Sequence, residues 1–391
     1  MSKIKIKIKS HNILILNSIT FLHGLMFFFP ILSLYLQQSL FTVANVALIF
    51  SIQSISSAIF EVPTGAIADL FGRKKTIILS TLVYILGLVS LYIGGGMMMF
   101  AAFAVLSALS GALYSGTDTA IMYDTLKNEG KEKYFKKLSG TYWAIWPLGA
   151  TIGSIVGGYM ATISLRTPVG YSLIPYALVL LASFFIVEPK YEKKVGATVN
   201  SHMLESVKDV LKNKQMLVIL AGGVIAWSFG ESSHNLSQIF YQFKQVPIIW
   251  FGFITAASFG LSSLGFYLSH DVSERFGNKN TVIASIVIAF SFLILATLTP
   301  SYIAIILFTV SSFFFGLRSP VLGHLWNEES ESRKRATLNS INSLVFQLGG
   351  AIAMPIIGYW ADLFTINTAF LISGIIVLVI STGFYAFLKK N

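Results

Sequence analysis

Long apolar runs separated by short polar segments occupy most of this 391-residue chain. A helix that crosses a lipid bilayer needs about 20 mostly apolar residues. Lipid offers no hydrogen-bond partner to a backbone N–H or C=O, so a helix is the economical way to cross it. The sequence therefore predicts an all-α membrane protein with twelve transmembrane helices, at 11–36, 43–68, 76–96, 98–122, 139–163, 168–188, 215–242, 247–269, 281–299, 301–324, 337–362 and 366–388.

The composition agrees with a surface that mostly faces lipid. Only 12% of the residues are charged and 54% are hydrophobic, whereas about a quarter of a soluble protein is charged. The chain has no cysteine, which excludes disulfides and thiolate metal sites. The basic start, MSKIKIKIK, leads into the first apolar run without a small-residue cleavage pattern, so we expect an uncleaved first membrane helix.

The basic residues predict how the chain is oriented. All but three of the 28 Lys and Arg side chains lie in the two terminal tails or in loops on the same side of a twelve-span protein; the exceptions are Arg166, Lys244 and Arg318. Cytoplasmic loops are rich in Lys and Arg, so both termini are expected in the cytoplasm. Because these charges are spread over seven segments, the net charge of +11 predicts no nucleic-acid partner.

The two parts of the chain repeat a common pattern. Shifts of 200 and 205 residues align several pairs, among them Gly149 with Gly349, Gly158 with Gly358, and Gly72 with Gly277. Two related six-helix halves around a midplane site are typical of secondary transporters, in which one half rocks against the other. We therefore predict two pseudosymmetric six-helix bundles joined by a cytoplasmic linker, at 1–188, 189–214 and 215–391.

Charged residues gather in the second predicted loop, GAIADLFGRKK. Gly65 would allow a neighbouring helix to approach closely, and Asp69 could cap a helix N-terminus. Gly72 would permit a tight turn. Arg73, followed by Lys74, offers a forked donor, for which we expect Asp124 to be the partner.

This loop and the overall pattern resemble the major facilitator superfamily. The pattern Gly65-x-x-x-Asp69-x-x-Gly72-Arg73-Lys74 is similar to the family's signature loop, and residues 274–279 form a degenerate copy in the second half. The resemblance covers the whole chain. It implies that Gly65, Asp69, Gly72, Arg73 and Lys74, together with Asp124, form a latch that holds the outward-facing state.

The fifth predicted span carries a second signature. Gly140, Gly149, Gly153, Gly157 and Gly158 resemble the antiporter motif of bacterial drug:proton exporters, although Ser154 stands where that family has proline. Glycines four residues apart lie on one helix face and let helices pack closely. We expect this face to pack against a helix of the other half, while ordinary packing within the bundle is the alternative.

Ionisable residues inside membrane spans are costly and are candidates for function. Glu231 lies near the middle of the seventh span, with His234 on the same helix face. A carboxylate in an apolar environment takes up a proton more readily than one in water. Glu231 is therefore a candidate for proton coupling, and a structural pairing with His234 or Arg318 is the alternative.

Three further charged residues lie in the cytoplasmic parts of their spans. Glu61 and Asp118 could form the inner end of a proton route, or could form ion pairs within the latch. Arg318 could bind an anionic substrate group, although we favour the hypothesis that it neutralises Glu61 or Asp118.

Aromatic residues at mid-membrane depth are candidates for lining a substrate cavity. Trp143, Trp146 and Trp227 lie away from the interface that tryptophan usually prefers, and they could stack against lipophilic or cationic compounds. Packing against lipid or core is the alternative. His23, near the middle of the first span, could line the cavity or pack as a neutral side chain.

The sequence shows no phosphate-binding loop, HExxH pattern or catalytic constellation, so we expect neither an enzyme nor a cofactor or metal site. The leading hypothesis is a monomeric, proton-coupled exporter of small lipophilic or cationic compounds in a bacterial cytoplasmic membrane. An uptake symporter for a polar nutrient is an alternative, because Gln53, Asn235, Gln238, Asn339 and Asn342 also lie in the spans. A membrane sensor or lipid-handling protein is a third hypothesis.

Overall fold

The computed structural model describes residues 10–190, 207–331 and 334–389, with the backbone alone for 62–71 and 336. Residues 1–9, 191–206, 332–333 and 390–391 lie outside the described part of the chain. The described residues form helices and no strands, and twelve helices or broken helices are long and apolar enough to cross a membrane. The predicted fold class is confirmed.

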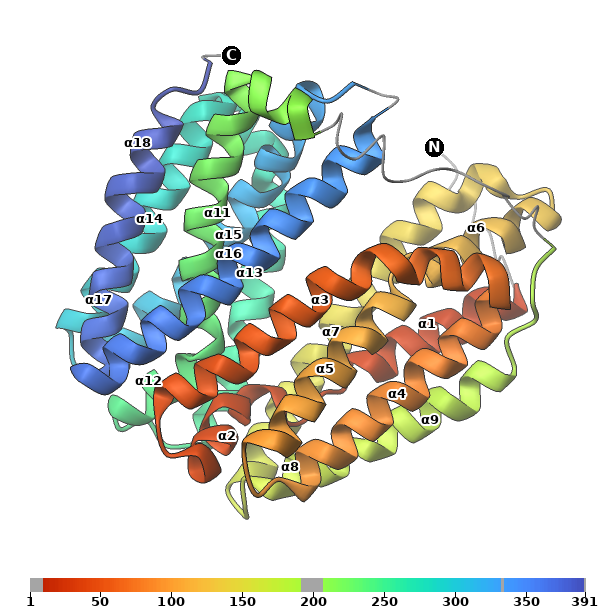
Figure 1. The fold of residues 1–391 in the computed structure, drawn as a ribbon, viewed down its shortest axis with the longest axis horizontal. Coiled ribbons are helices and arrows are strands. Elements are labelled where there is room, and N and C mark those ends of the chain that lie inside the picture. Colours follow the sequence, from red (N-terminus) through yellow and green to blue (C-terminus); the bar gives the residue numbers. More distant parts are fainter. Residues whose placement is uncertain (1–9, 191–206, 332–333, 390–391) are drawn as a thin grey trace, which may run out of the picture.

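The helices of residues 10–190 form one group, which we call the N-terminal group (Figure 1). Its helices are α1 (His11–Gly24), η1 (Phe29–Ile31), α2 (Leu32–Leu40), α3 (Val43–Phe71), α4 (Arg73–Ile93), α5 (Met97–Tyr114), α6 (Thr117–Asn128), η2 (Glu132–Tyr134), α7 (Phe135–Ala161), α8 (Arg166–Tyr171) and α9 (Leu173–Phe184).

The remaining helices form the C-terminal group. They are α11 (Lys214–Asn235), α12 (Ser237–Phe243), α13 (Ile249–Phe276), α14 (Asn278–Leu298), α15 (Ser301–Glu328), α16 (Arg335–Leu363), α17 (Ile366–Ile376), the π-helical turn η3 (Val377–Ser381) and α18 (Thr382–Tyr385).

The two groups meet at one end and splay apart at the other (Figure 1). We call the splayed end, where the described chain begins and ends, the terminal face, and the other end the opposite face. Near the opposite face, Gly158 of α7 packs on Gly252 of α13, and a Cβ on Gly158 would lie 2.7 Å from the Gly252 nitrogen. The Asp362 carboxylate of α16 also accepts hydrogen bonds from the first two amides of α3, at 2.7 and 2.8 Å.

The buried core follows the same division. The larger cluster of buried apolar side chains includes residues of both groups, such as Leu36 and Phe240, which are fully buried. A second cluster, which contains Leu16, Ile77 and Met122, lies within the N-terminal group alone. The apolar contact that joins the two groups therefore belongs to the larger cluster.

Two of the spans are broken well within their length, and a third, α11, is followed after one residue by the short helix α12. The first span breaks after Gly24 and resumes at a short turn containing Pro30. The fourth breaks at Gly116, whose φ of +76° favours glycine. In the seventh, Leu236 separates α11 from α12. Irregular backbone at membrane depth is tolerated where it is buried in protein or lines a cavity.

The sequence repeat has a counterpart in the hydrogen bonds. Gly72 and Gly277 precede α4 and α14 with φ of +95° and +82°, as the predicted tight turn requires. The Lys74 ammonium donates to the carbonyl of Phe184, at the end of α9. The Lys279 ammonium donates to carbonyls near the end of α18, at 2.6 and 2.8 Å. In each group, the lysine after this turn therefore ties the third span to the end of the sixth.

Candidate functional site

The larger of two neighbouring cavities measures about 1130 Å³. It lies between the N-terminal group and α13, and Phe259 and Phe266 form its wall on the α13 side. Ser80 and Tyr84, about two and three turns into α4 from the terminal face, also line it. Its surface is mostly apolar and aromatic, and its size suits a small organic molecule.

Asp118 is the carboxylate of this first cavity. Its side chain is 3% exposed. One carboxylate oxygen accepts a hydrogen bond of 2.5 Å from the Tyr142 hydroxyl, and the other accepts one of 2.7 Å from the Thr119 amide. The Tyr114 hydroxyl lies 3.0 Å from that of Tyr142, which extends the polar chain. Asp118 makes no ion pair with a described residue, so the ion pair within the latch, one of the two alternatives for this carboxylate, is absent from this structure.

His23 lies in the same cavity, among tyrosine rings. Its ring lies 4.7 Å from that of Tyr114 and 5.3 Å from that of Tyr176, measured between centroids. Tyr84 stacks on Tyr176 at 4.3 Å. These rings form a continuous aromatic wall from α1 to α4 and α9. His23 therefore both packs against aromatic rings and lines the cavity.

The second cavity, of about 460 Å³, lies mostly in the C-terminal group. Residues of α11, α13, α14 and α15 line it, and Phe29 and Trp146 close it from the N-terminal group. It shares Trp146, Phe259 and Ser262 with the first cavity. The two cavities therefore adjoin one another between the helix groups.

Glu231 and His234 both line the second cavity. The Glu231 carboxylate accepts a long hydrogen bond of 3.4 Å from the Asn235 side-chain amide. Among the described residues, neither His234 nor Arg318 lies within ion-pair distance of Glu231. The structural pairing considered as an alternative for Glu231 is absent from this conformation.

Arg318 also lines the second cavity, and its side chain is 5% exposed. Its guanidinium lies 5.7 Å from the ring centroid of Phe290 and 5.4 Å from that of Phe315. Within the described part of the chain, no carboxylate lies within 4.0 Å of it. The expected neutralisation by Glu61 or Asp118 is therefore wrong in this structure.

Glu61 lies on α3 and lines neither cavity. It accepts a hydrogen bond of 3.0 Å from the Ser343 hydroxyl of α16, so it joins the two groups. This position gives no support to a proton route through Glu61.

The three tryptophans of interest all line a cavity. Trp143 lines the first, Trp227 the second, and Trp146 both. Trp146 meets Phe259 edge-on at 5.7 Å, and Trp227 stacks on Phe346 at 5.9 Å. Together with His23, His234 and Arg318, all six residues that we selected from the sequence as cavity candidates thus face one of the two cavities.

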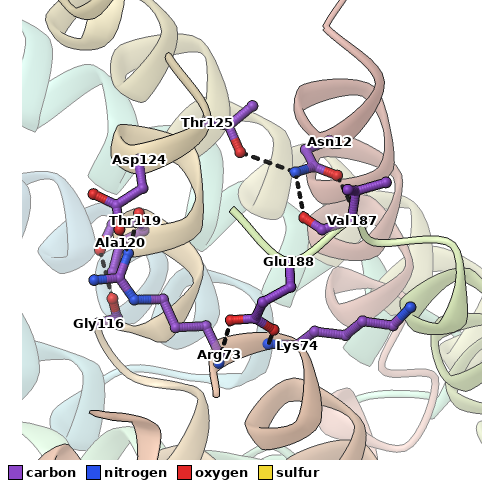
Figure 2. A network of polar contacts seen from close by, with 10 residues as sticks. All are labelled: Asn12, Arg73, Lys74, Gly116, Thr119, Ala120, Asp124, Thr125, Val187 and Glu188. Carbon is purple, nitrogen blue, oxygen red and sulfur yellow. Dashed lines mark hydrogen bonds and ion pairs between the residues drawn. The ribbon is translucent and has the colours of Figure 1, made fainter. Parts of the chain in front are cut away.

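The charged loop forms a network at the terminal face of the N-terminal group (Figure 2). The Arg73 guanidinium forms an ion pair with Asp124, the partner expected from the sequence, and donates to the Ala120 carbonyl at 2.8 Å. The Glu188 carboxylate accepts the Arg73 and Lys74 amides, both at 2.8 Å, and so caps the start of α4. Sequence reasoning missed Glu188, although a carboxylate at the end of the sixth apolar run was a visible signal.

Asn12 also belongs to this network and was missed. Its amide nitrogen donates to the Thr125 hydroxyl at 2.9 Å and to the Val187 carbonyl at 2.8 Å, and its oxygen accepts the Val187 amide. An amide side chain at the start of the first predicted span was the available signal. Asn12 therefore ties the start of α1 to α6 and to the segment after α9 (Figure 2).

The described contacts of the latch lie within the N-terminal group. Arg73 and Asp124 both belong to that group, and their ion pair does not cross to the other. The side chains of Gly65 and Asp69 lie outside the described residues. The latch role of the loop therefore stays a prediction, and its closed form would require the terminal face to close.

The glycines of α7 pack mainly within their own group. A Cβ on Gly149 or Gly157 would overlap the carbonyl oxygen of Phe21 or Phe27, and one on Gly153 would lie 3.0 Å from the Leu25 Cα. These contacts correct the expectation that the glycine face packs against the other half, although α7 itself also packs against α13. That expectation holds only for Gly158, which meets Gly252 of the C-terminal group, whereas a Cβ on Gly140 would meet nothing within 4 Å.

Twelve spans arranged as two related groups around central cavities define a membrane transporter. The family model "Major Facilitator Superfamily" matches residues 14–268 and 245–391, so the chain belongs to this superfamily, whose members are transporters and not enzymes.

Relatives with curated names are similar along most of the chain. "Multidrug resistance protein 2" of Bacillus subtilis (strain 168) is 24% identical over 336 residues, which cover 83% of this chain and 82% of that protein. "Multidrug efflux protein YfmO" of the same organism is 22% identical over 364 residues, covering 90% and 86%.

Solved structures share the fold at lower identity. The nucleoside transporter NupG has a TM-score of 0.81 and 16% identity, covering 98% of this chain and 100% of that one. A D-xylose-proton symporter has a TM-score of 0.71 and 14% identity, covering 97% of both chains. These structures indicate the fold and leave the substrate open.

Proposed function

We propose that this transporter exports small lipophilic or cationic compounds, coupled to protons, by alternating access. The first cavity carries the proposal. It is large, mostly apolar and aromatic, and holds the carboxylate of Asp118. Aromatic faces suit lipophilic and cationic molecules through stacking and cation–π contact. A buried carboxylate that can exchange a proton couples the occupancy of such a cavity to protonation.

The polar side chains of the spans favour export over uptake of a sugar-like nutrient. Among the described residues, neither cavity is lined by Asn or Gln. Gln53 donates to Ser107, Asn235 to Glu231, and Gln238 accepts from Ser33. Three of the five amides that kept the symporter hypothesis open, Gln53, Asn235 and Gln238, are thus engaged in contacts within the protein. The names of the two Bacillus relatives add support for export.

The proposed cycle rocks two domains, residues 1–188 and 215–391, about the cavities. The splayed terminal face corresponds to one end state of the cycle (Figure 1). In the other end state, the terminal face is closed. Contacts at the opposite face, such as that of Gly158 with Gly252, are then broken. By the distribution of Lys and Arg, we assign the terminal face to the cytoplasm of a bacterial inner membrane. The structure described here is then the inward-facing state of a transporter that acts as a monomer.

Two carboxyls line the cavities and are our candidates for proton coupling. Asp118 is buried and hydrogen-bonded by neutral donors, and Glu231 faces the second cavity. Each can bind a proton from, or release it to, the space that holds the substrate. Glu61, outside both cavities, is the weaker candidate.

The test is movement of ethidium, a lipophilic cation, in proteoliposomes with an imposed proton gradient. We expect the wild-type protein to move ethidium against its own gradient. Asp118→Asn or Glu231→Gln, whichever residue couples, should abolish gradient-driven movement and retain counterflow, since counterflow needs no net proton transfer. Gradient-driven accumulation of a sugar or nucleoside without ethidium movement would contradict export. If both variants behave as wild type, neither carboxyl couples.

A further inference from the structure

Arg318 is a buried cation that faces a cavity without a counter-charge among the described residues. Its side chain is 5% exposed. No described carboxylate lies within 4.0 Å of the guanidinium, and it donates no hydrogen bond within the described part of the chain. A buried charge without a partner is costly. A site that retains such a charge is suited to a ligand that supplies the missing anion.

The walls around Arg318 are aromatic. The rings of Phe290 and Phe315 lie 5.7 and 5.4 Å from its guanidinium, and Trp227 lies 5.5 Å from Phe315. These rings hold the cation in place and leave its N–H donors free of protein acceptors. They also offer flat apolar surfaces to a ring-bearing ligand within a cavity of about 460 Å³.

Glu231 and His234 bring two further ionisable side chains to the second cavity. Both belong to α11, and both line the same cavity as Arg318. The carboxylate of Glu231 repels an anion, so an anionic group is directed away from that carboxylate and toward the guanidinium of Arg318. The guanidinium fork matches a carboxylate or sulfonate through two parallel hydrogen bonds.

We propose that the second cavity binds a small aromatic anion, a ring bearing a carboxylate or sulfonate, with Arg318 as the anion-binding residue. The rings of Trp227, Phe290 and Phe315 bind the aromatic part of this ligand. This proposal rests on the proposed transport function and extends its substrate class to organic anions. The first cavity, with Asp118, serves neutral and cationic compounds, and the second serves anionic ones.

The experiment measures binding and needs no proton gradient. Tritiated naphthalene sulfonate and its neutral analogue naphthalene sulfonamide are bound to the purified full-length chain in a scintillation proximity assay. We expect Arg318→Gln to weaken sulfonate binding about tenfold or more, because a charge-assisted pair is lost, and to change sulfonamide binding by less than about twofold. Arg166→Gln is the matched control, because it removes an exposed cation that lines neither cavity.

Each outcome decides the proposal. If Arg318→Gln binds the sulfonate as well as the wild type does, the proposal is overturned. An equal loss of binding for sulfonate and sulfonamide would also overturn it, because that result indicates a structural role for Arg318. If Arg318→Gln does not give folded protein, Arg318→Lys decides. The lysine variant should bind sulfonate more weakly than the wild type while binding the sulfonamide equally well, and unchanged preference would overturn the role of the fork. If chloride displaces the labelled sulfonate as effectively as unlabelled sulfonate does, the proposal that the rings bind the aromatic part of the ligand is overturned.

The result is separable from that for the proposed function. Sulfonate binding that depends on Arg318, with no gradient-driven movement of ethidium, would support the site and contradict proton-coupled export. Gradient-driven movement of ethidium, together with sulfonate binding that does not depend on Arg318, would support proton-coupled export and contradict the site.

Discussion

The amide and hydroxyl of Ser33 both donate to the side-chain oxygen of Gln238, which links α2 of one helix group to α12 of the other. Both residues are buried, at 0% and 5% exposure, near the opposite face. Because the two residues belong to different helix groups, this bond exists only when the two groups meet. Under the proposed cycle, it stabilises the state described here.

Replacing Gln238 with Leu should destabilise the closed opposite face. The buried donors of Ser33 would lose their acceptor, at a cost of about 1–3 kcal/mol. Because the chain has no cysteine, spin labels can be placed at Ile163→Cys and Tyr302→Cys, two exposed positions on different groups. We expect electron–electron distance measurements to show a larger population of long distances in the Gln238→Leu protein. An unchanged distribution would show that this bond does not hold the face closed.

A Cβ at position 252 should prevent the same closure by steric overlap. A Cβ on Gly252 would overlap the carbonyl oxygen of Ser154, whereas one on Gly260 of the same helix would meet nothing within 4 Å. We expect Gly252→Ala to reduce ethidium movement at least about tenfold and to lengthen the distance between the two labels, because rigid backbone must separate. Gly260→Ala is the control and should behave as wild type. Normal transport by Gly252→Ala would contradict the need for this close contact.

Loss of the Glu188 side chain should destabilise the N-terminal group. Its carboxylate caps α4 by accepting two amides, and such caps contribute about 1–2 kcal/mol. We expect Glu188→Ala to lower the melting temperature by several degrees in a thermal unfolding assay. Glu129→Ala removes only a partly exposed pair with Lys131, which contributes little, and is the control. Equal melting temperatures for the two variants would show that the cap contributes nothing measurable.

Variants at the α7 glycines can distinguish a role in packing from a role in transport. A Cβ on Gly157 would overlap the Phe27 carbonyl oxygen, so Gly157→Ala must displace the first span. We expect a lower yield of folded protein and a lower melting temperature. Gly140→Ala on the same helix meets nothing within 4 Å and should match the wild type. A fully stable Gly157→Ala protein with altered transport would favour a role beyond packing.

Much of the fold was predictable because membrane spans depend on local composition. The break between the third and fourth spans falls at Gly94, Gly95 and Gly96, where the apolar pattern is interrupted. The pairing of Arg73 with Asp124 was also predictable, since both lie at span ends on the same side. The charge and the apolar length of a segment are local properties, and they do not depend on how the helices pack together.

The rest depends on contacts between segments far apart in the chain. The orientation of Arg318 between two phenylalanines follows from how α14 and α15 pack, and its position in the sequence alone equally allowed pairing with Glu61 or Asp118. The α7 glycines were expected to face the other group. Their spacing defines a helix face, but it does not identify the helix that packs against that face. The break at Gly116 places Asp118 in the first turn of α6, and a glycine within a predicted span gave little warning of it.

The first turn of α3 is completed by a carboxylate from another part of the molecule. Asp362, at the far end of α16, accepts the amides of Val43 and Ala44, 319 and 318 residues away in sequence. When the two groups separate there, these amides must turn to water instead. Opening of the opposite face therefore requires hydration of these amides as well as movement of the two groups. Lowering water activity with an excluded osmolyte should favour the closed opposite face.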